Sequence, residues 1–122
     1  MIGYTCVGTN DFPRAVAFYD TLLGLMGAKR FFESDRGVGW ATAGDKPMFS
    51  VMKPFDGGAA TVGNGTMVAL AAANREQVEA LYAKALALGG KDEGVPGLRG
   101  DNFYGAYFRD LDGNKLAAFC MT

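Results

Sequence analysis

Residues 10–27 read NDFPRAVAFYDTLLGLMG, and residues 73–90 read ANREQVEALYAKALALGG. Three pairs of matching positions in these stretches share an interval of 63 residues: Asp11 with Asn74, Tyr19 with Tyr82, and Gly27 with Gly90. A repeat at a fixed interval of about half the chain indicates a tandem duplication. The chain therefore reads as two copies of one structural unit, each built around one of these stretches.

Both stretches carry the start and stop signals of a helix. The side chains of Asp11 and Asn74 can accept hydrogen bonds from the free N–H groups of a first helical turn, and Pro13 is tolerated in that turn. Gln77 stands where a capping box needs it, three residues after Asn74. Apolar residues then recur at helical spacing. Glycines provide the stops: Gly24 or Gly27 for the first helix, and Gly89 with Gly90 for the second.

Short apolar runs on both sides of the helices predict strands. In the first half we expect strands at 2–8, 28–33, 38–42 and 47–53. In the second half we expect them at 66–72, 104–109 and 114–121, with an irregular piece at 90–93 and a loop at 94–104. The predicted fold class is α+β, with two tandem βαβββ modules in a single domain of residues 1–122.

The modules span residues 1–53 and 66–122, and a glycine-rich segment of residues 54–65 joins them. This segment reads either as a plain connection between the modules or as an ordered lid over a site. Residues 110–114 read DLDGN and resemble the start of a calcium loop, but the glycine comes too early and Met121 stands where the glutamate ligand would be. We interpret 110–114 as a plain turn between two strands.

Composition excludes several classes of function. The 122 residues include 12 Lys and Arg against 13 Asp and Glu, which gives a net charge of −1 and no basic run for nucleic acid. No apolar stretch is long enough to cross a membrane, and the N-terminus lacks the features of a secretion signal, so we expect a cytoplasmic protein. The chain has no histidine and only two cysteines, which excludes imidazole catalysis and the common zinc sites.

The motif AFYD at 17–20 together with YGAYFRDLDGNKLAAF at 104–119 resembles the vicinal oxygen chelate superfamily, which includes glyoxalase I, bleomycin-resistance proteins and extradiol dioxygenases. Residues 96–99, which read PGLR, are similar to the short glyoxalase-like members. The resemblance implies that the two modules curl their sheets into a cup that holds a divalent metal and a substrate. It also implies a homodimer.

The metal is where this sequence departs from the family. The four positions that match the ligands of the metal-using members are Tyr4, Ser50, Met67 and Ala117. None of these is a normal ligand of a hard or borderline divalent metal. We therefore expect no metal and no cofactor, and glyoxalase and extradiol chemistry both lose their central component.

An apolar, aromatic cup suits a small organic ligand. Strand alternation turns Tyr4, Ser50, Met52, Met67, Ala117 and Phe119 toward the cup. Met and Phe at these positions can equally fill a closed core. Three further candidates are polar residues of the segment 94–104: Arg99, which can clamp a carboxylate or phosphate, Asn102 and Tyr104.

Several of these candidates have a structural alternative. Arg99 can instead lie in solvent or pair with Asp101. Tyr104 and Tyr107 point to opposite faces of their strand, so only one of them reaches a ligand. Trp40 can stack on a ligand with its N–H on an acceptor, or be buried in the core.

Three functions fit these observations. The first is a small-molecule-binding protein that sequesters a partly aromatic ligand in a metal-free cup. The second is a metal-independent lyase, isomerase or hydrolase that acts on a small carbonyl compound. The third is an interaction module with a closed cup.

Overall fold

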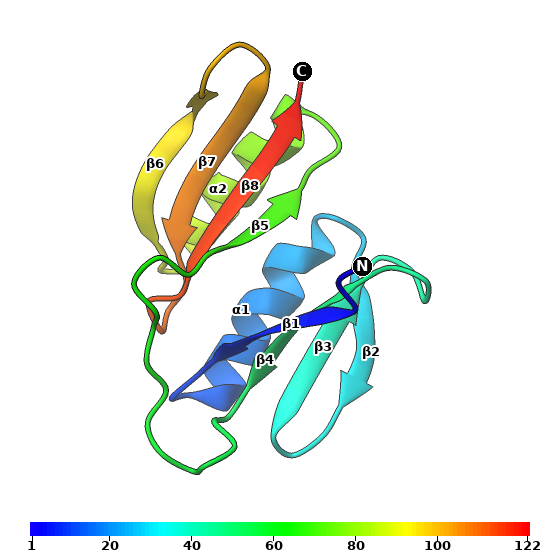
Figure 1. The fold of residues 1–122 in the computed structure, drawn as a ribbon, viewed down its shortest axis with the longest axis vertical. Coiled ribbons are helices and arrows are strands. Elements are labelled where there is room, and N and C mark those ends of the chain that lie inside the picture. Colours follow the sequence, from blue (N-terminus) through cyan, green and yellow to red (C-terminus); the bar gives the residue numbers. More distant parts are fainter. The chain divides into compact units, whose positions relative to one another are not determined.

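A computed structural model describes all residues from 1 to 122. The chain divides into two compact units, Met1–Val62 and Gly63–Thr122. Figure 1 shows that each unit consists of one sheet and one helix. No helix has both the length and the apolar character needed to cross a membrane.

The first unit contains β1 (Tyr4–Gly8), α1 (Phe12–Gly24), β2 (Lys29–Glu33), β3 (Gly37–Ala41) and β4 (Met48–Met52). Its four strands form a sheet in the order β1-β4-β3-β2. β1 runs parallel to β4, while the other neighbours are antiparallel. The parallel pair needs a crossover, which begins with α1.

The second unit contains β5 (Val68–Ala71), α2 (Arg75–Ala87), β6 (Lys91–Leu98), β7 (Phe103–Arg109) and β8 (Lys115–Met121). The strand order is β5-β8-β7-β6, and β5 is parallel to β8. This is the topology of the first unit repeated. The α+β fold with two tandem βαβββ modules, predicted from the 63-residue interval, is therefore confirmed.

Both helices begin at the predicted caps. Asp11 Oδ1 accepts a hydrogen bond from Arg14 N at 3.2 Å, and Asn74 Oδ1 accepts one from Gln77 N at 2.9 Å. The Gln77 side chain accepts from Ala73 N at 2.8 Å, one residue before the position that a standard capping box uses. These bonds satisfy N–H groups that a helix cannot pair internally.

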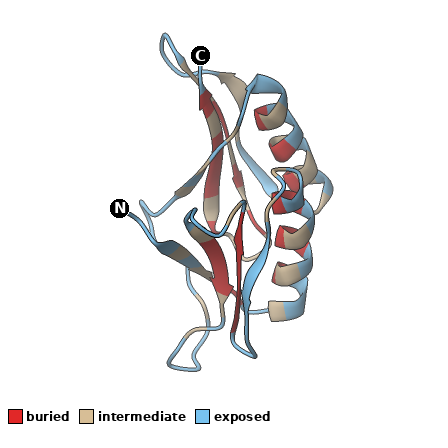
Figure 2. Ribbon diagram, turned by 90° about the vertical axis from the view of Figure 1, so that its right-hand side faces the viewer, coloured by how far each residue is buried: buried red, intermediate tan, exposed pale blue.

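One face of each sheet packs against the helix of the same unit. In the first unit the Tyr19 ring lies 4.7 Å from the Phe49 ring and 5.9 Å from the Trp40 ring, measured between centroids. In the second unit the core includes Val78, Leu81, Ala85, Phe108 and Leu116, all fully buried. Figure 2 shows buried residues on the strands and on the helix sides that face them. The helix side of each sheet is thus a conventional apolar core.

The structure corrects the expected loop at 94–104. β6 continues to Leu98, and only residues 99–102 form the turn to β7. β6 does not show the regular alternation of a strand in its sequence, because its pairing with β7 is irregular. The β6–β7 register shifts between Asp92 and Gly94 and again between Gly94 and Gly97. β6 is also an edge strand, where Pro96 is tolerated.

The segment 110–114 is a turn in which the Asp110 carboxylate accepts hydrogen bonds from the turn itself. Asp110 Oδ1 accepts hydrogen bonds from the N–H groups of Asp112 and Asn114, both at 2.9 Å. Its Oδ2 accepts from Asn114 Nδ2, also at 2.9 Å. Asp110 is 5% exposed, so this carboxylate organises the turn from inside.

Candidate functional site

The register of the first sheet decides which side chains point away from α1. Tyr4 pairs with Met48 and Cys6 pairs with Ser50, and paired residues point to the same side of a sheet. Trp40 and Phe49 face the helix, so the alternate positions face the other way. We call this surface the far face of the first sheet; it contains Tyr4, Cys6, Met48, Ser50 and Met52.

Two methionines cover glycines of β3 on this far face. A Cβ atom on Gly37 would lie 2.0 Å from Met52 Sδ, and one on Gly39 would lie 3.0 Å from Met48 Sδ. A side chain at either position would displace the thioether. The two glycines therefore let the methionines lie flat against β3.

Ser50 lies between these methionines on β4 and is fully buried. Its Oγ has no hydrogen-bond partner. A Cβ on Gly39 would lie 3.0 Å from this Oγ and 3.0 Å from Met48 Sδ, so the hydroxyl and the thioether together fill the space beside that glycine. An unpaired buried hydroxyl is costly in a folded protein, and Ser50 carries the buried side-chain oxygen on this face whose hydrogen bond is unmet.

The glycine-rich connection forms part of a pocket in the first unit. Asn10 Oδ1 accepts from Ala60 N at 2.7 Å, and Asn10 Nδ2 donates to Ala60 O at 3.1 Å. A pocket of about 490 Å³ is lined by residues of β1, among them Tyr4 and Cys6, by Arg36 and Met52, and by residues 53–56 and 59–61. The part of the connection up to Thr61 therefore lines a pocket of the first unit.

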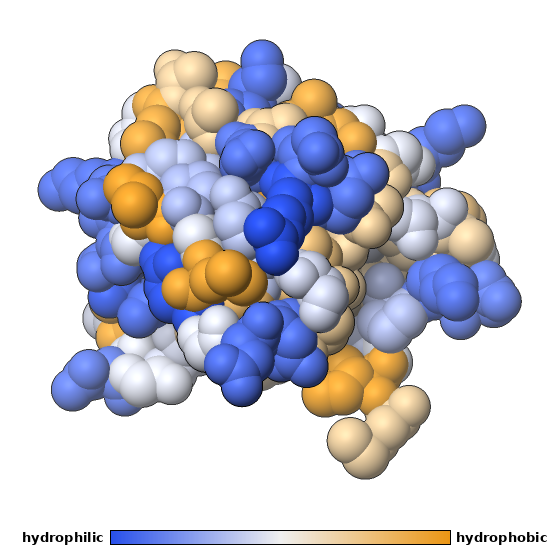
Figure 3. All heavy atoms as spheres, turned by 90° about the horizontal axis from the view of Figure 1, so that it is seen from above, coloured by the Kyte–Doolittle hydropathy of each residue, from blue (hydrophilic) through white to orange (hydrophobic).

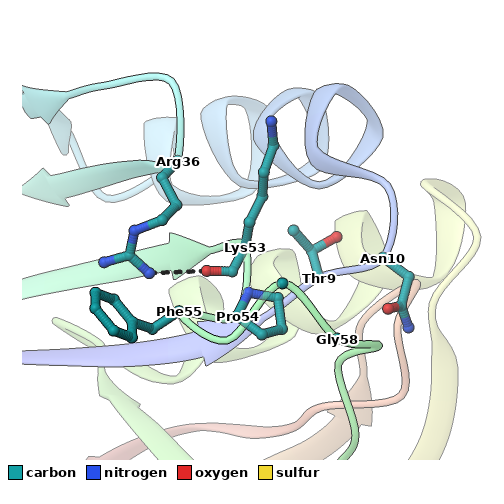
Figure 4. Close-up of a pocket in the computed structure, with 8 residues that line it drawn as sticks. Thr9, Asn10, Arg36, Lys53, Pro54, Phe55 and Gly58 are labelled. Atoms are coloured by element: carbon teal, nitrogen blue, oxygen red, sulfur yellow. Dashed lines mark hydrogen bonds between the residues drawn. The ribbon is translucent and has the colours of Figure 1, made fainter.

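A neighbouring pocket of about 420 Å³ is lined by Thr9, Asn10, Gly57 and Gly58 (Figure 4). Arg36 and residues 53–55 line both pockets. Arg36 Nη1 donates to Lys53 O at 2.9 Å, and its Cζ lies 5.4 Å from the Phe55 ring centroid. Phe55 is 92% exposed. Sequence reasoning missed Arg36 and Phe55, and an aromatic residue inside a glycine-rich segment was the only signal for the pair.

Trp40 belongs to the core and not to the far face. It is 2% exposed, and its Nε1 donates to Asp20 Oδ1 of α1 at 2.8 Å. Arg30 Nε also donates to Asp20 Oδ1, at 3.0 Å. Hydrogen bonds from Arg30 and Trp40 hold the pKa of Asp20 below its usual value, against the opposing effect of burial. The prediction that Trp40 contacts a ligand is wrong, because β3 turns position 40 toward α1.

The second sheet also has a face turned away from its helix. Tyr107 pairs with Ala117, and Gly105 pairs with Phe119. Ala117 pairs with Ala69 on β5, and Met67 comes two residues before Ala69, outside the strand. The far face of the second sheet contains Ala69, Phe103, Tyr107, Lys115, Ala117 and Phe119.

Tyr104 lies on the opposite side of β7, against α2. Its hydroxyl donates to Glu79 Oε2 at 3.2 Å, and the Arg75 Cζ lies 4.8 Å from its ring centroid. Partial desolvation, followed by the hydrogen bond to Glu79, raises the pKa of the Tyr104 phenol. Tyr104 therefore packs on the helix side of the sheet, and Tyr107 is the tyrosine of this strand that faces away from the helix.

Arg99 folds back over β6. Its Nη2 donates to Val95 O at 2.6 Å, and its Cζ lies 5.5 Å from the Tyr107 ring centroid. Arg99 is exposed, as the first of its two structural alternatives expects, and it forms no ion pair with Asp101. Asn102 is exposed in the turn after β6, where its carbonyl accepts a hydrogen bond from Thr122 N at 2.8 Å.

The residues at the family's metal positions do not fit a divalent ion. The register places Cys6, not Tyr4, opposite Ser50, and it places Ala69, not Met67, opposite Ala117. No group of three His, Cys, Asp or Glu side chains is arranged to hold a metal ion. One buried hydroxyl beside thioethers is a poor donor set for metals that prefer carboxylates or imidazole.

Apolar side chains are also exposed outside these far faces. Figure 3 shows them in small groups separated by hydrophilic residues on the face that it presents. Scattered apolar groups of this size are ordinary on a protein surface and do not mark a second site.

Comparison with solved structures places the chain in a family. A glyoxalase/bleomycin resistance protein from Albidiferax ferrireducens T118 is 35% identical and superposes with a TM-score of 0.92, covering 100% of this chain and 99% of that one. A glyoxalase/bleomycin resistance protein/dioxygenase family enzyme from Burkholderia phytofirmans PsJN shares the fold at 19% identity, with a TM-score of 0.78 and 98% of each chain covered. Lactoylglutathione lyase from Agrobacterium tumefaciens shares it at 19% identity and a TM-score of 0.70, with 98% of this chain and 92% of that one covered.

No curated protein sequence matches the chain. The model of the Glyoxalase/Bleomycin resistance protein/Dioxygenase superfamily matches residues 1–118. The chain therefore belongs to the glyoxalase/bleomycin resistance/dioxygenase superfamily.

Proposed function

We propose that this protein binds a small, partly aromatic organic molecule on the far face of a sheet, without a metal ion, and acts by sequestering it. The observation that carries this proposal is the composition of the two far faces. The far face of the first sheet carries Tyr4, Met48 and Met52 and one buried unpaired hydroxyl, that of Ser50, and the far face of the second sheet carries Tyr107, Ala117 and Phe119. Mostly apolar walls with a few placed polar groups are typical of sites for organic ligands.

The placement of Asp20, Tyr82 and Tyr104, three ionisable groups with shifted pKa values, favours binding over catalysis. Asp20 is held by Arg30 and Trp40, and the hydroxyl of Tyr82 donates to Asp92 at 2.9 Å. Tyr104 is held by Glu79. These groups serve the packing of the helices on the sheets. A metal-independent lyase, isomerase or hydrolase, the alternative function, would need a proton-transfer group on a far face, where Tyr4, Cys6 and Tyr107 are the candidates.

Native mass spectrometry of the purified protein, compared with its denatured mass, tests the metal-free proposal. We expect the bare chain or an organic adduct, with or without prior treatment with a chelator. A metal-sized adduct near one per chain that survives the chelator would overturn the proposal and restore metal-dependent chemistry to first place.

The mass of a bound organic molecule then separates sequestration from turnover. After incubation and denaturation, sequestration returns the molecule with its mass unchanged. A new product that accumulates beyond one equivalent per chain would establish an enzyme instead. Tyr4→Phe, Cys6→Ala and Tyr107→Phe would then show which side chain the reaction needs.

The proposal also includes a cytoplasmic homodimer, which rests on the family resemblance. Light scattering coupled to size-exclusion chromatography measures the mass in solution directly. A mass of one chain across the micromolar range would remove the dimer from the proposal and leave the ligand site untouched.

A further inference from the structure

We infer that the ligand is an aromatic acid and that Arg99, Tyr107 and Lys115 bind its anionic group on the far face of the second sheet. This inference rests on the proposed function, since it names the chemical class of the molecule bound there. The argument concerns the second unit alone.

Two cations flank one tyrosine on this face. The Arg99 Cζ lies 5.5 Å and the Lys115 Nζ 5.6 Å from the centroid of the Tyr107 ring. Tyr107 points away from α2, because it pairs with Ala117 and lies opposite in parity to Tyr104. A phenol hydroxyl, a guanidinium and an ammonium are thus gathered within one small area.

The backbone of β6 is shaped to hold the guanidinium there. A Cβ atom on Gly97 would lie 3.0 Å from Arg99 Nη1, and one on Gly94 would lie 3.3 Å from Arg99 Nη2. A Cβ on Gly94 would also lie 2.9 Å from Tyr107 Cδ2. Both glycines therefore leave the space in which Arg99 lies flat beside Tyr107.

These two cations have no carboxylate partner, unlike the next cation on the face. Arg109 Nε pairs with Glu93 at 2.7 Å, which holds the pKa of Glu93 low, and Lys115 contributes to that effect from a greater distance. The Arg99 side chain forms a single hydrogen bond, to the Val95 carbonyl, and a guanidinium has five N–H donors. The charge on this part of the face is therefore complementary to an anion.

An aromatic surface lies beside the cations. The Phe103 and Phe119 rings are stacked, with centroids 5.2 Å apart and planes 2° from parallel. Phe119 lies two residues along β8 from Ala117, the partner of Tyr107, and two residues of a strand span about 6.6 Å. Between Tyr107 and Phe119 on this face lies Ala117, whose side chain is a single methyl group. A ligand with an aryl ring on the phenylalanines and a carboxylate near Arg99 fits this spacing.

The test compares acids with matched neutral molecules. Aryl carboxylates with none to three methylene groups between ring and carboxylate are titrated against the corresponding alcohols, and amide chemical shifts of the full chain are followed by NMR. We expect at least one acid to bind about tenfold more tightly than its alcohol, with shifts at Gly94, Tyr107 and Ala117, and to weaken as salt is raised.

Variants then assign the effect to the two cations. Arg99→Gln and Lys115→Gln together should abolish the preference for the acid while leaving the affinity of the alcohol within about twofold. Arg14→Gln is the matched control, because Arg14 is an exposed cation of the first unit paired with Asp11. Spectra of each variant without ligand report whether its fold is intact, and Arg99→Lys provides a second variant should Arg99→Gln disturb β6.

Each remaining outcome has a definite meaning. If acids and alcohols bind equally well on this face, the inference fails and the proposed function stands. If acids are preferred but the double variant keeps the preference, these cations are not the anion site and the inference fails. If no probe of either series binds at millimolar concentration, both the inference and the proposed function are overturned.

Discussion

Trp40 of β3 donates its indole N–H to the carboxylate of Asp20 on α1, at 2.8 Å. The same carboxylate accepts from Arg30 of β2, so one acidic residue of the helix joins two strands of the sheet. Trp40 is 2% exposed, whereas the Asp20 side chain is 38% exposed. The hydrogen bond therefore holds the buried Trp40 ring through a carboxylate that lies at the edge of the core.

We expect Trp40→Phe to destabilise the first unit by about 2–4 kcal/mol, because it removes a hydrogen bond to a charged group and leaves a cavity beside Tyr19. Urea unfolding followed by circular dichroism measures this change. Asp20→Asn should cost less, since the amide oxygen still accepts the indole N–H. A Trp40→Phe variant as stable as the parent would contradict the structural role given to this residue.

Asp20 should also make the stability depend on pH at the acidic end. Its pKa is lower in the folded chain than the usual value of 3.8, so its contribution is fully present above that value and is lost as the pH falls through the folded pKa. Between pH 5 and pH 2, the unfolding free energy of the parent should therefore fall more than that of Asp20→Asn. Parallel curves for the two proteins would show that the carboxylate adds nothing to folding.

Ser50 and Ser34 make a matched pair of serines. Ser50 Oγ is buried without a partner, whereas Ser34 Oγ accepts hydrogen bonds from Arg36 N at 3.2 Å and Gly37 N at 3.1 Å. Ser50→Ala should leave the stability unchanged or raise it by about 1 kcal/mol, and Ser34→Ala should lower it by about 0.5–1.5 kcal/mol. Thermal unfolding of the two variants tests the contrast.

The same Ser50→Ala variant tests the ligand site. If the hydroxyl bonds to the bound molecule, this variant should lose about 1 kcal/mol of binding free energy while its fold gains or keeps stability. Titration of parent and variant with an organic molecule that shifts amide signals of the first unit gives both affinities. Equal affinities would remove Ser50 from the site.

Tyr104 and Tyr107 should respond differently to substitution. Tyr104→Phe removes the hydrogen bond to Glu79, so we expect a loss of stability of about 0.5–1 kcal/mol with no effect on ligand affinity. Tyr107→Ala should weaken binding at least several-fold, because it removes the ring between Arg99 and Lys115. The reverse result would return Tyr104 to the ligand site.

Two glycines provide opposite predictions for the same substitution. A Cβ on Gly90 would lie 2.6 Å from the Arg109 carbonyl oxygen and 2.8 Å from that of Ala85, so Gly90→Ala should destabilise the second unit by several kcal/mol, about 2–4. Gly24, at the end of α1, has nothing within 4 Å of its Cβ position. Gly24→Ala should stabilise the chain by about 0.4–1 kcal/mol. Unfolding midpoints in urea check both.

Local signals were sufficient for much of the fold. The caps at Asp11 and Asn74 and the shared interval between the halves predicted both helices and the repeated topology. The exception was β6, since Gly94, Pro96 and Gly97 read as a loop. Their pairing partners on β7 lie about ten residues away, and an edge strand with shifted register has no regular alternation to detect.

The candidate site was less accessible to sequence reasoning. Alternation separates Tyr104 from Tyr107 but cannot say which of them faces the helix, because both residues are compatible with either side. Alternation likewise cannot say whether Trp40 points toward α1 or away from it. The pocket wall of residues 53–61 depends on the Asn10 hydrogen bonds to Ala60, which join positions 50 residues apart and leave no local pattern.

The alternation of helix-side and far-face residues has an evolutionary consequence. Along the central strands, alternate residues pack on the helix and the residues between them point to the far face. Phe49 and Ser50 of β4 are an example. Substitutions can therefore accumulate on the second set while the residues that hold the fold together stay unchanged. The chemistry of the far face can therefore differ between proteins that share this scaffold while the helix-side core keeps the same fold.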